Sequence, residues 1–388
     1  MRCLEKQLAE AVTRRRQDGT ARFLRVLPPS NVDFCSNDYL GLSRNARLAA
    51  LIRDADVDPT NGSTGSRLIT GHSPLHAAVE DELAAFYGTD AALVFNSGYL
   101  ANLSIMSSVP QPTDVVLFDA LVHNSCREGL RLCRAKTVES FRHNDLTHLE
   151  AQLKRYASPT ANTIVVVESV YSMDGDVTPL LALVTLCEAH GASVIVDEAH
   201  STAVMGPRGA GLVRELNLQH RVLCTVFTFG KGMGIHGAVV CSSPVLKEYL
   251  INYARPFIYS TSLPAHDMYV IQCAHRVCAD SDAARADLLS LISHFRARVG
   301  ADPAIPPAAL LPSDTAIQGL LFQGNEAALA AAAFLGGEGF NVVAIRAPTV
   351  PANAERLRII LHAFNTYDEV DRLVAAVGRL FRQRQSAL

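Results

Sequence analysis

Short, uninterrupted hydrophobic runs are the most regular feature of the middle of the chain. Runs rich in valine and isoleucine occupy residues 163–167 and 193–196, and a helix-like segment lies between them at 179–190. Strands of a parallel sheet that is covered on both faces are apolar along their whole length and alternate with helices. The pattern therefore predicts consecutive strand–helix–strand units. Further strands are predicted at residues 91–95, 115–119, 222–229 and 237–241.

The chain on either side of this sheet has a different pattern. Leu4, Leu8 and Val12 have helical spacing, so the N-terminal arm is predicted to contain a helix, followed by a short strand. Toward the other end, a tract rich in proline and alanine at 301–312 precedes three apolar segments, at 317–322, 326–335 and 356–361. We expect an α/β protein with a mostly parallel central sheet and a smaller α+β C-terminal domain. The expected boundaries are 1–45 for the arm, 46–267 for the large domain and 268–388 for the C-terminal domain.

Composition and charge describe an ordinary folded protein. The chain has 388 residues, 49% of them hydrophobic and 19% charged, which is enough for two or three domains. A net charge of −3 gives no basic face for nucleic acid, and no apolar run is long enough to span a membrane, so neither partner is expected. Nine cysteines without a Cys-x-x-Cys pair argue against a disulfide framework and against a zinc site, so no metal is expected.

The two ends of the chain bear on its location. Glu5 and Glu10 disfavour a transit peptide, and no apolar signal core is present, so a cytoplasmic location is expected. The last three residues, Ser386-Ala387-Leu388, are a weak match to the peroxisomal tripeptide because the basic middle residue is missing. A peroxisomal location is the alternative.

Lys231 stands in a glycine-rich turn, Gly230-Lys231-Gly232-Met233-Gly234, directly after a predicted strand. The glycines at 232, 234 and 237 spell G-x-G-x-x-G, the fingerprint of a dinucleotide site. We disfavour that interpretation because no acidic residue follows about 20 residues on and a following helix is interrupted at residues 241–244. A solvated loop lysine is the ordinary alternative. The third possibility is a Schiff-base lysine, whose small neighbours leave room for a flat aromatic cofactor.

Asp197 and His200 favour the third possibility. They follow the predicted strand at 193–196, at the strand end where sites of parallel sheets lie. An aspartate there can pair with a protonated pyridine nitrogen, which keeps the ring able to accept electrons. The same Asp-Glu-Ala-His sequence occurs in metal and helicase boxes, but the chain has no G-K-[ST] loop to accompany a helicase box.

Two further segments fit such a cofactor. Gly98 and Tyr99 follow the predicted strand at 91–95 and begin a helix, whose N-terminal N–H groups suit a phosphate. His123 follows the strand at 115–119 and could stack on the ring, although a lone histidine is more often structural.

With these residues in view, the chain resembles the α-oxoamine synthases, a family of the aspartate-aminotransferase-like (fold type I) pyridoxal-phosphate enzymes. The similar segments include Ser36-Asn37-Asp38-Tyr39-Leu40-Gly41-Leu42 and Thr228-Phe229-Gly230-Lys231-Gly232. Others lie at 62–71, 96–102, 143–145, 168–175, 196–211, 259–264 and 346–358. The resemblance implies a fold type I enzyme, a transferase of the acyltransferase class, with pyridoxal 5′-phosphate as its cofactor.

The resemblance also implies a role for each matching residue. Lys231, Asp197, His200 and His123 would be catalytic: Lys231 would form the Schiff base, Asp197 would pair with the pyridine nitrogen, His200 would contact the ring's phenolic oxygen and His123 would stack on the ring. Gly98, Tyr99, Ser172 and Thr228 would position the cofactor, and Ser260 and Thr261 would reach the phosphate of a partner subunit, which implies a homodimer. The substrate-binding residues would be Arg346 and Thr349, with Asn37 beside Arg346, and Arg22 or else Arg25 at the acyl chain.

The activity implied is the condensation of an amino acid with an acyl-CoA, with loss of carbon dioxide. Among family members, the tracts at 346–351 and 228–232 are most similar to biotin-pathway enzymes, which implies L-alanine and pimeloyl-CoA as substrates. The tracts at 62–67 and 362–366 are most similar to the fungal members. Two alternatives stay open. One is a related synthase that joins another amino acid to a fatty or polyketide acyl thioester. The other is a noncatalytic partner subunit, which the presence of Lys231 disfavours.

Overall fold

The computed structural model describes residues 3–54 and 60–386 and divides them into two compact units. Unit 2, the larger, holds 38–172 and 177–285, and unit 1 holds 1–37, 173–176 and 286–388. The division falls within α12 (Asp282–Ala301), so the helix begins in unit 2 and continues in unit 1. The proline- and alanine-rich tract at 301–312 therefore lies inside unit 1, after that helix.

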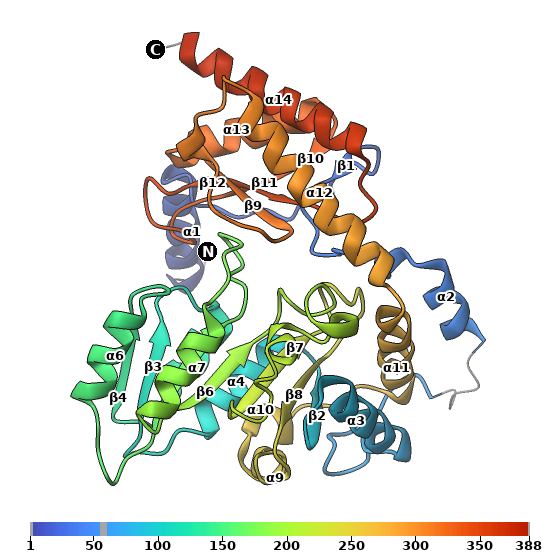
Figure 1. Ribbon diagram of the computed structural model, residues 1–388, viewed down its shortest axis with the longest axis vertical. Coiled ribbons are helices and arrows are strands. Elements are labelled where there is room, and N and C mark those ends of the chain that lie inside the picture. The colour runs from blue at the N-terminus through green and yellow to red at the C-terminus, as the bar shows by residue number, and fades with distance from the viewer. Residues whose placement is uncertain (1–2, 55–59, 387–388) are drawn as a thin grey trace. The chain divides into compact units, whose positions relative to one another are not determined.

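A seven-stranded sheet forms the centre of unit 2, in the order β2-β8-β7-β6-β5-β3-β4 (Figure 1). Its strands are β2 (Ala91–Phe95), β3 (Val115–Asp119), β4 (Thr137–Phe141), β5 (Thr163–Glu168), β6 (Ser193–Asp197), β7 (Cys224–Thr228) and β8 (Ala238–Ser242). Strand β8 is antiparallel to both of its neighbours, β2 and β7, and the other strand pairs of this sheet are parallel. The mostly parallel α/β fold expected from the sequence is confirmed.

The apolar runs of these strands supply two separate cores because successive residues of a strand face opposite sides of a sheet. Ile164, Val166 and Ile195 pack in one core, and the alternate residues Val165 and Val194 pack in the other. Helices α4 (Gly98–Ser108), α5 (Asn124–Arg131), α9 (Pro244–Tyr253) and α10 (Arg255–Ile258) cover the first core. Helices α6 (Leu146–Arg155), α7 (Leu180–Ala189) and α8 (Leu212–Glu215) cover the second.

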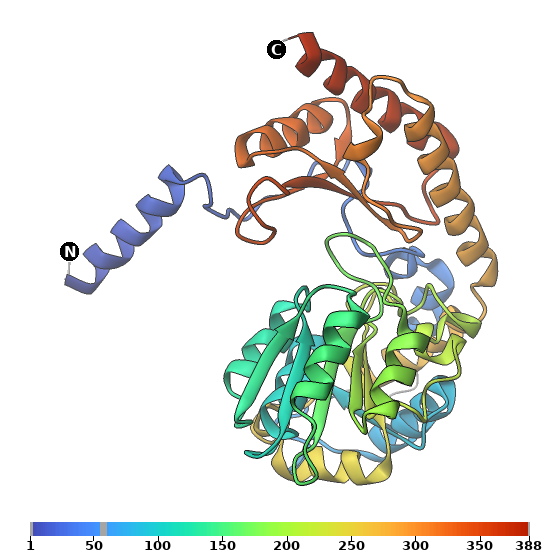
Figure 2. The same cartoon turned by 60° about the vertical axis from the view of Figure 1, so that its left-hand side comes forward.

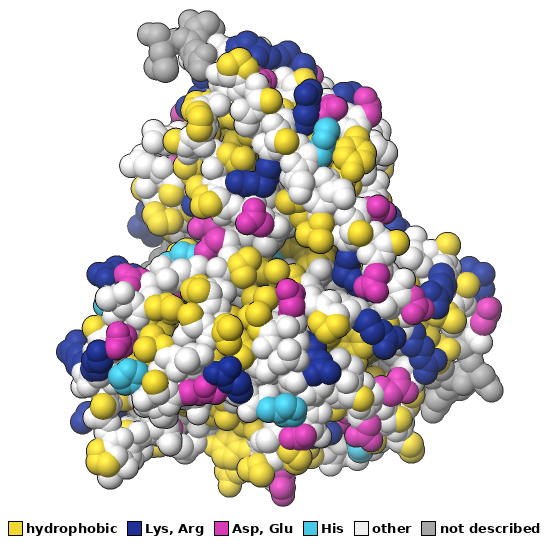
Figure 3. All heavy atoms as spheres, viewed as in Figure 1, with side chains coloured by type: hydrophobic (Ala, Val, Ile, Leu, Met, Phe, Trp, Pro, Cys, Tyr) yellow, Lys and Arg dark blue, Asp and Glu magenta, His cyan; other side chains and the backbone are white. Residues whose placement is uncertain are grey.

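The remaining helices of unit 2 are α2 (Ala46–Arg53), α3 (Pro74–Tyr87) and α11 (Ala265–Ala279), and α11 packs on both of the others. The outer side of α7 stays apolar: Leu181 is 49% exposed and lines an open groove with Leu216. Hydrophobic side chains are also visible on this face of unit 2 in Figure 3.

Unit 1 contains an antiparallel sheet in the order β11-β12-β9, together with a parallel pair of short strands, β1 and β10. Its strands are β1 (Val32–Asp33), β9 (Ile317–Leu321), β10 (Phe340–Asn341), β11 (Val343–Ile345) and β12 (Arg356–Ile360). Helix α13 (Asn325–Gly337) packs on β10, β11 and β12, and α14 (Tyr367–Ser386) packs on α13. Helix α1 (Cys3–Gln17) stands away from this sheet in Figure 2, and none of its residues is buried.

The predicted strands at 91–95 and 115–119 match β2 and β3 at both ends, and the other predicted strands agree within two residues. The helix and the short strand expected in the N-terminal arm are α1 and β1. No helix within residues 3–54 and 60–386 is long and apolar enough to cross a membrane. The C-terminal tripeptide ends in Ala387 and Leu388, which lie outside the described residues.

Ile195 tests the packing of the first core because its side chain is 1% exposed at the centre of β6. Ile195→Ala leaves a cavity there, so we expect the free energy of unfolding to fall by about 2–5 kcal/mol. Urea denaturation followed by circular dichroism measures the change. Leu181→Ala, on the exposed side of α7, is the matched control and should change stability by no more than about 0.5 kcal/mol. Equal losses in both variants would contradict this packing.

Candidate active site

The chemically active side chains of unit 2 follow the carboxyl ends of its parallel strands. Because parallel strands end at the same edge of a sheet, residues that follow them gather there. Glu168 ends β5 and lies in register with Asp197, which ends β6. The other candidates follow neighbouring strands: Gly98 after β2, His123 after β3, His200 after β6, and Thr228 and Lys231 at and after the end of β7.

Lys231 contacts His200, which in turn contacts Tyr39. His200 Nε2 lies 2.9 Å from Lys231 Nζ, and His200 Nδ1 lies 2.6 Å from Tyr39 Oη. Both His200 and Tyr39 are buried. The histidine therefore joins the lysine to a buried tyrosine that the motif-based assignment did not include.

Asp197 is held by two donors. Asn102 Nδ2 donates to Asp197 Oδ2 at 2.6 Å, and the backbone N–H of Ala199 donates to Oδ1 at 2.9 Å. The Asn102 amide also donates to Ser125 Oγ, which lies 2.8 Å from His123 Nδ1. Asp197 and His123 are thus connected through Asn102 and Ser125, and the orientation of both candidate residues depends on this network.

His123 is anchored through its backbone as well. Its N–H donates to the carboxylate of Glu168 at 2.5 Å. Burial and the nearby charge of Lys231 lower the pKa of His123, although Asp197 opposes them. A neutral imidazole suits stacking on a flat ring. Burial, and next the charge of Asp197, raise the pKa of Glu168 well above its ordinary value.

The turn between β2 and α4 meets the end of β7. A Cβ atom on Gly98 would lie 3.0 Å from Thr228 Cβ and Oγ1, so only glycine fits there without a shift. The side chain of Ser97 accepts the N–H of Leu100 and caps the helix, and Tyr99 is 44% exposed. The first turn of α4 and the Thr228 hydroxyl therefore place several hydrogen-bond donors side by side.

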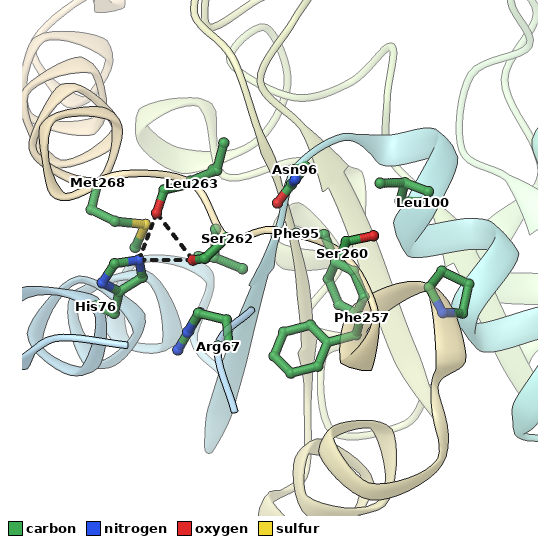
Figure 4. Close-up of a pocket in the computed structure, with 12 residues that line it drawn as sticks. Arg67, His76, Phe95, Asn96, Leu100, Phe257, Ser260, Ser262, Leu263 and Met268 are labelled. Carbon is green, nitrogen blue, oxygen red and sulfur yellow. Dashed lines mark hydrogen bonds between the residues drawn. The ribbon is translucent and has the colours of Figure 1, made fainter. Parts of the chain in front are cut away.

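Ser260 and Thr261 lie beside the same turn. Asn96 Nδ2 donates to the carbonyl of Thr261 at 2.8 Å. Ser260 lines a pocket with Asn96 and Arg67 (Figure 4). Ser172 lies in the loop after β5.

The candidate substrate residues lie in unit 1. Arg346 donates from Nη1 to the carbonyl of Gly19 and from Nη2 to the carbonyl of Ala21, at 3.1 Å for the latter. Asn37 was expected beside Arg346, but its side-chain oxygen accepts from Arg358 Nη2 at 3.0 Å. Arg358 lies on β12 and is buried.

Thr349 and Arg22, the other two substrate candidates, both lie near Arg346. The N–H of Thr349 donates to the carbonyl of Arg346 at 2.9 Å. Arg22 is exposed and directly follows Ala21, whose carbonyl Arg346 contacts. Arg25, the alternative acyl-chain contact, is exposed as well.

The dinucleotide interpretation of the glycine turn is wrong. The turn leads from β7 directly into β8, an antiparallel strand, whereas the fingerprint requires a helix after its glycines. The glycines serve close packing. A Cβ on Gly232 would lie 2.4 Å from the carbonyl oxygen of Thr202, and Gly234 has a φ of 64°.

Comparisons with known proteins show the family of the chain. The chain belongs to the aminotransferase class I and II family, whose model matches residues 29–377. It is 37% identical over 394 residues to 8-amino-7-oxononanoate synthase of Emericella nidulans, which covers 97% of this chain and 96% of the relative. It is 42% identical over 352 residues to the Burkholderia thailandensis protein of the same name, covering 89% and 88%.

A solved structure is similar along the full length. It is serine palmitoyltransferase from S. paucimobilis, in a lysine-to-alanine variant with a bound PLP–myriocin aldimine. The TM-score is 0.88 at 26% identity, and 100% of each chain is covered. The expected fold type I architecture is confirmed by this likeness.

Glu198, between Asp197 and His200, provides a pH test of the site's packing. Its buried carboxylate accepts the N–H groups of Leu212 and Val213, yet burial raises its pKa from 4.5 to about 7. A carboxyl group with a raised pKa binds more protons when folded, so its contribution to stability is lost as pH rises from about 4.5 to about 7.

Glu198→Gln removes that ionisation. We expect the free energy of unfolding of the wild type to fall by about 3 kcal/mol more than that of the variant between pH 4.5 and pH 7, from the size of the pKa difference. Urea denaturation at several pH values measures both slopes. Glu326→Gln, at an exposed position of α13, should keep the wild-type slope. A Glu198→Gln slope equal to that of the wild type would contradict the assignment.

Proposed function

We propose that the protein catalyses the condensation of L-alanine with pimeloyl-CoA to give 8-amino-7-oxononanoate, coenzyme A and carbon dioxide, the reaction of biotin biosynthesis that its relatives' name implies. The observation that carries the proposal is the position of Lys231, His200 and Asp197 at the carboxyl ends of two adjacent parallel strands. A subunit without catalytic function would need none of these three side chains.

The residues present fit pyridoxal 5′-phosphate. Lys231 offers a primary amine for its aldehyde, and Asp197 offers a carboxylate for its pyridine nitrogen. The absence of a side chain at Gly98 leaves the first turn of α4 close to the Thr228 hydroxyl, a donor set suited to a phosphate.

Bound at this site, the cofactor supplies an electron-accepting ring for a carbanion at the α-carbon of an amino acid. Asp197 would hold a proton at the ring nitrogen, and His123 would lie against the ring. Lys231, once its amine is free, would accept the α-proton of alanine at Nζ. His200 would donate a hydrogen bond to the ring's phenolic oxygen, and Ser172 would help to position the ring.

The overall reaction balances without a further reactant. A bond forms between the α-carbon of alanine and the thioester carbonyl carbon, and the carbon–sulfur bond breaks, so coenzyme A leaves as a thiol. The alanine carboxylate then leaves as carbon dioxide, and a proton takes its place. A condensation of serine with a fatty acyl-CoA is the second candidate because a serine palmitoyltransferase is structurally similar along the full chain.

We further propose a homodimer. Ser260 and Thr261 lie at the surface beside the β2–α4 turn, and Thr261 is exposed. Their hydroxyl groups would complete the phosphate site of a second copy. A cofactor bound by both copies makes the dimer the active species.

An assay of coenzyme A release tests the proposal. Glycine, alanine and serine are each paired with acetyl-, succinyl-, pimeloyl- and palmitoyl-CoA. We expect turnover with alanine and pimeloyl-CoA, and a product with the mass of 8-amino-7-oxononanoate. Lys231→Ala should abolish turnover because no other amine is positioned there, whereas Lys154→Ala, at an exposed position of α6, should retain it. Serine with palmitoyl-CoA as the preferred pair would establish the second candidate instead.

The arginines of unit 1 give a separate test. The sequence assigned the substrate carboxylate to Arg346, but the guanidinium of Arg346 already binds two backbone carbonyls, and Arg358 lies beside Asn37. We therefore propose Arg358 for this role. Removing a charge-assisted hydrogen bond costs about 1.5–3 kcal/mol, so Arg358→Ala should raise the KM for alanine roughly ten- to a hundredfold.

Arg346→Ala is the matched comparison in this test. It should raise the KM for alanine less than Arg358→Ala does. Steady-state kinetics with varied alanine measure both effects. If Arg346→Ala alone weakened alanine binding, the original assignment to Arg346 would stand.

A further inference from the structure

Two hydrogen bonds connect Tyr39 through His200 to Lys231. Tyr39 Oη lies 2.6 Å from His200 Nδ1, and His200 Nε2 lies 2.9 Å from Lys231 Nζ. Tyr39 is 1% exposed. The rings of Tyr39 and His200 meet edge-on, at an interplanar angle of 61°. The proposed function uses His200 and Lys231 but does not explain why the far nitrogen of the histidine is joined to a buried tyrosine.

The lysine turn passes close to the ring of Tyr39. A Cβ atom added at Gly232 would lie 3.4 Å from Tyr39 Cδ2, so the backbone of the turn runs beside the ring. The neighbouring carboxylate of Asp38 accepts hydrogen bonds from both the N–H and the hydroxyl of Ser43. This local network restrains the segment that carries Tyr39, so its hydroxyl has a defined position relative to His200.

The imidazole of His200 can couple the Tyr39 hydroxyl to the protonation of Lys231. A neutral imidazole carries one proton, so the nitrogen that accepts a hydrogen bond forces the proton onto the other. If Tyr39 donates to Nδ1, the proton lies on Nε2 and points at Lys231. An ammonium group has no acceptor for it, whereas a neutral amine does. A donating Tyr39 thus favours the neutral form of Lys231.

Other charged groups also act on Lys231. The charge of Lys231 affects the titration of both His123 and Glu168, and Asp197 acts on both of those residues. Because the hydroxyl of Tyr39 contacts Nδ1 of His200, replacing that hydroxyl changes the His200 side of the lysine.

We propose that Tyr39 is a positioning residue that holds His200 with its proton on Nε2 and thereby keeps Lys231 Nζ a neutral amine. This proposal rests on the proposed function for its catalytic meaning, because a neutral amine is the form that attacks an aldehyde and accepts an α-proton. The protonation of Lys231 itself can be measured without the cofactor.

The full-length protein, freed of cofactor, is labelled briefly with acetic anhydride at a series of pH values. Mass spectrometry of peptides then gives the reactivity of each lysine, and the chain has five lysines, so the other four are internal references. In Tyr39→Phe, we expect the midpoint of Lys231 labelling to move upward by about one pH unit, the shift that corresponds to the loss of one hydrogen bond.

The chain offers a matched control. Tyr87 Oη lies 3.0 Å from His275 Nε2, and both residues are buried, so Tyr87→Phe removes a hydrogen bond of the same kind elsewhere in unit 2. Tyr87→Phe should leave the Lys231 midpoint unchanged. An unchanged midpoint in Tyr39→Phe, or the same shift in both variants, would overturn the proposal. Thermal unfolding of both variants separates a loss of folding from a change in protonation.

A double variant tests the route through His200. In a His200→Asn background, adding Tyr39→Phe should produce little further shift, because the two residues act as one unit. A full additional shift would show that Tyr39 acts on Lys231 by another route and would overturn the role of the histidine. Failure of the wild type to load pyridoxal phosphate on Lys231 would instead refute the proposed function, and the labelling result would still decide the role of Tyr39.

Discussion

The hydrogen bonds that His200 makes to Lys231 on one side and to Tyr39 on the other are the interaction on which the rest of the site depends. Lys231 can attack an aldehyde or accept an α-proton only when its amine is neutral. Its partner at 2.9 Å is the imidazole of His200, which can either donate or accept a hydrogen bond. The protonation of the lysine is therefore set by the state of the histidine. That state depends in turn on a tyrosine 161 residues earlier in the chain.

The sheet makes this arrangement possible. Each chemically active side chain follows a parallel strand whose interior is apolar on both faces, so the strands are held firmly by two cores. The polar residues can then stand at the strand ends without weakening the packing. Asp197 and Glu168 lie in register there, and burial of two neighbouring carboxyl groups is costly unless one stays protonated or positive charge is nearby. Glu168 meets this condition, because burial and the charge of Asp197 raise its pKa well above the ordinary value and favour its protonated form.

Much of unit 2 could be predicted from the sequence. Its strands are continuous runs of valine and isoleucine, and Lys231, Asp197 and His200 directly follow such runs, so their position at one edge of the sheet follows from the parallel topology. Strand β4 was missed because Thr137–Phe141 contains polar residues and lies at the edge of the sheet, where full burial is not required.

The residues that support the site could not be assigned in the same way. Tyr39 and Asn102 lie within segments that match the family, but only the folded chain shows that they contact His200 and Asp197. The sequence also could not decide between Arg346 and Arg358. Both lie in one matching tract, and their difference appears only in what their guanidinium groups contact. The boundary expected at 267/268 precedes the division at 285/286 because α11 packs on α2 and α3 of unit 2.

Removal of the α-proton of alanine by Lys231 is the step on which the proposed reaction rests, and proton exchange measures this step alone. L-Alanine is incubated with the protein and pyridoxal phosphate in D₂O, without any acyl-CoA, and the α-proton signal is followed by NMR. We expect the wild type to replace the α-proton with deuterium while the methyl protons persist, and Lys231→Ala to leave the α-proton in place. Exchange at the wild-type rate in Lys231→Ala would contradict the role of Lys231.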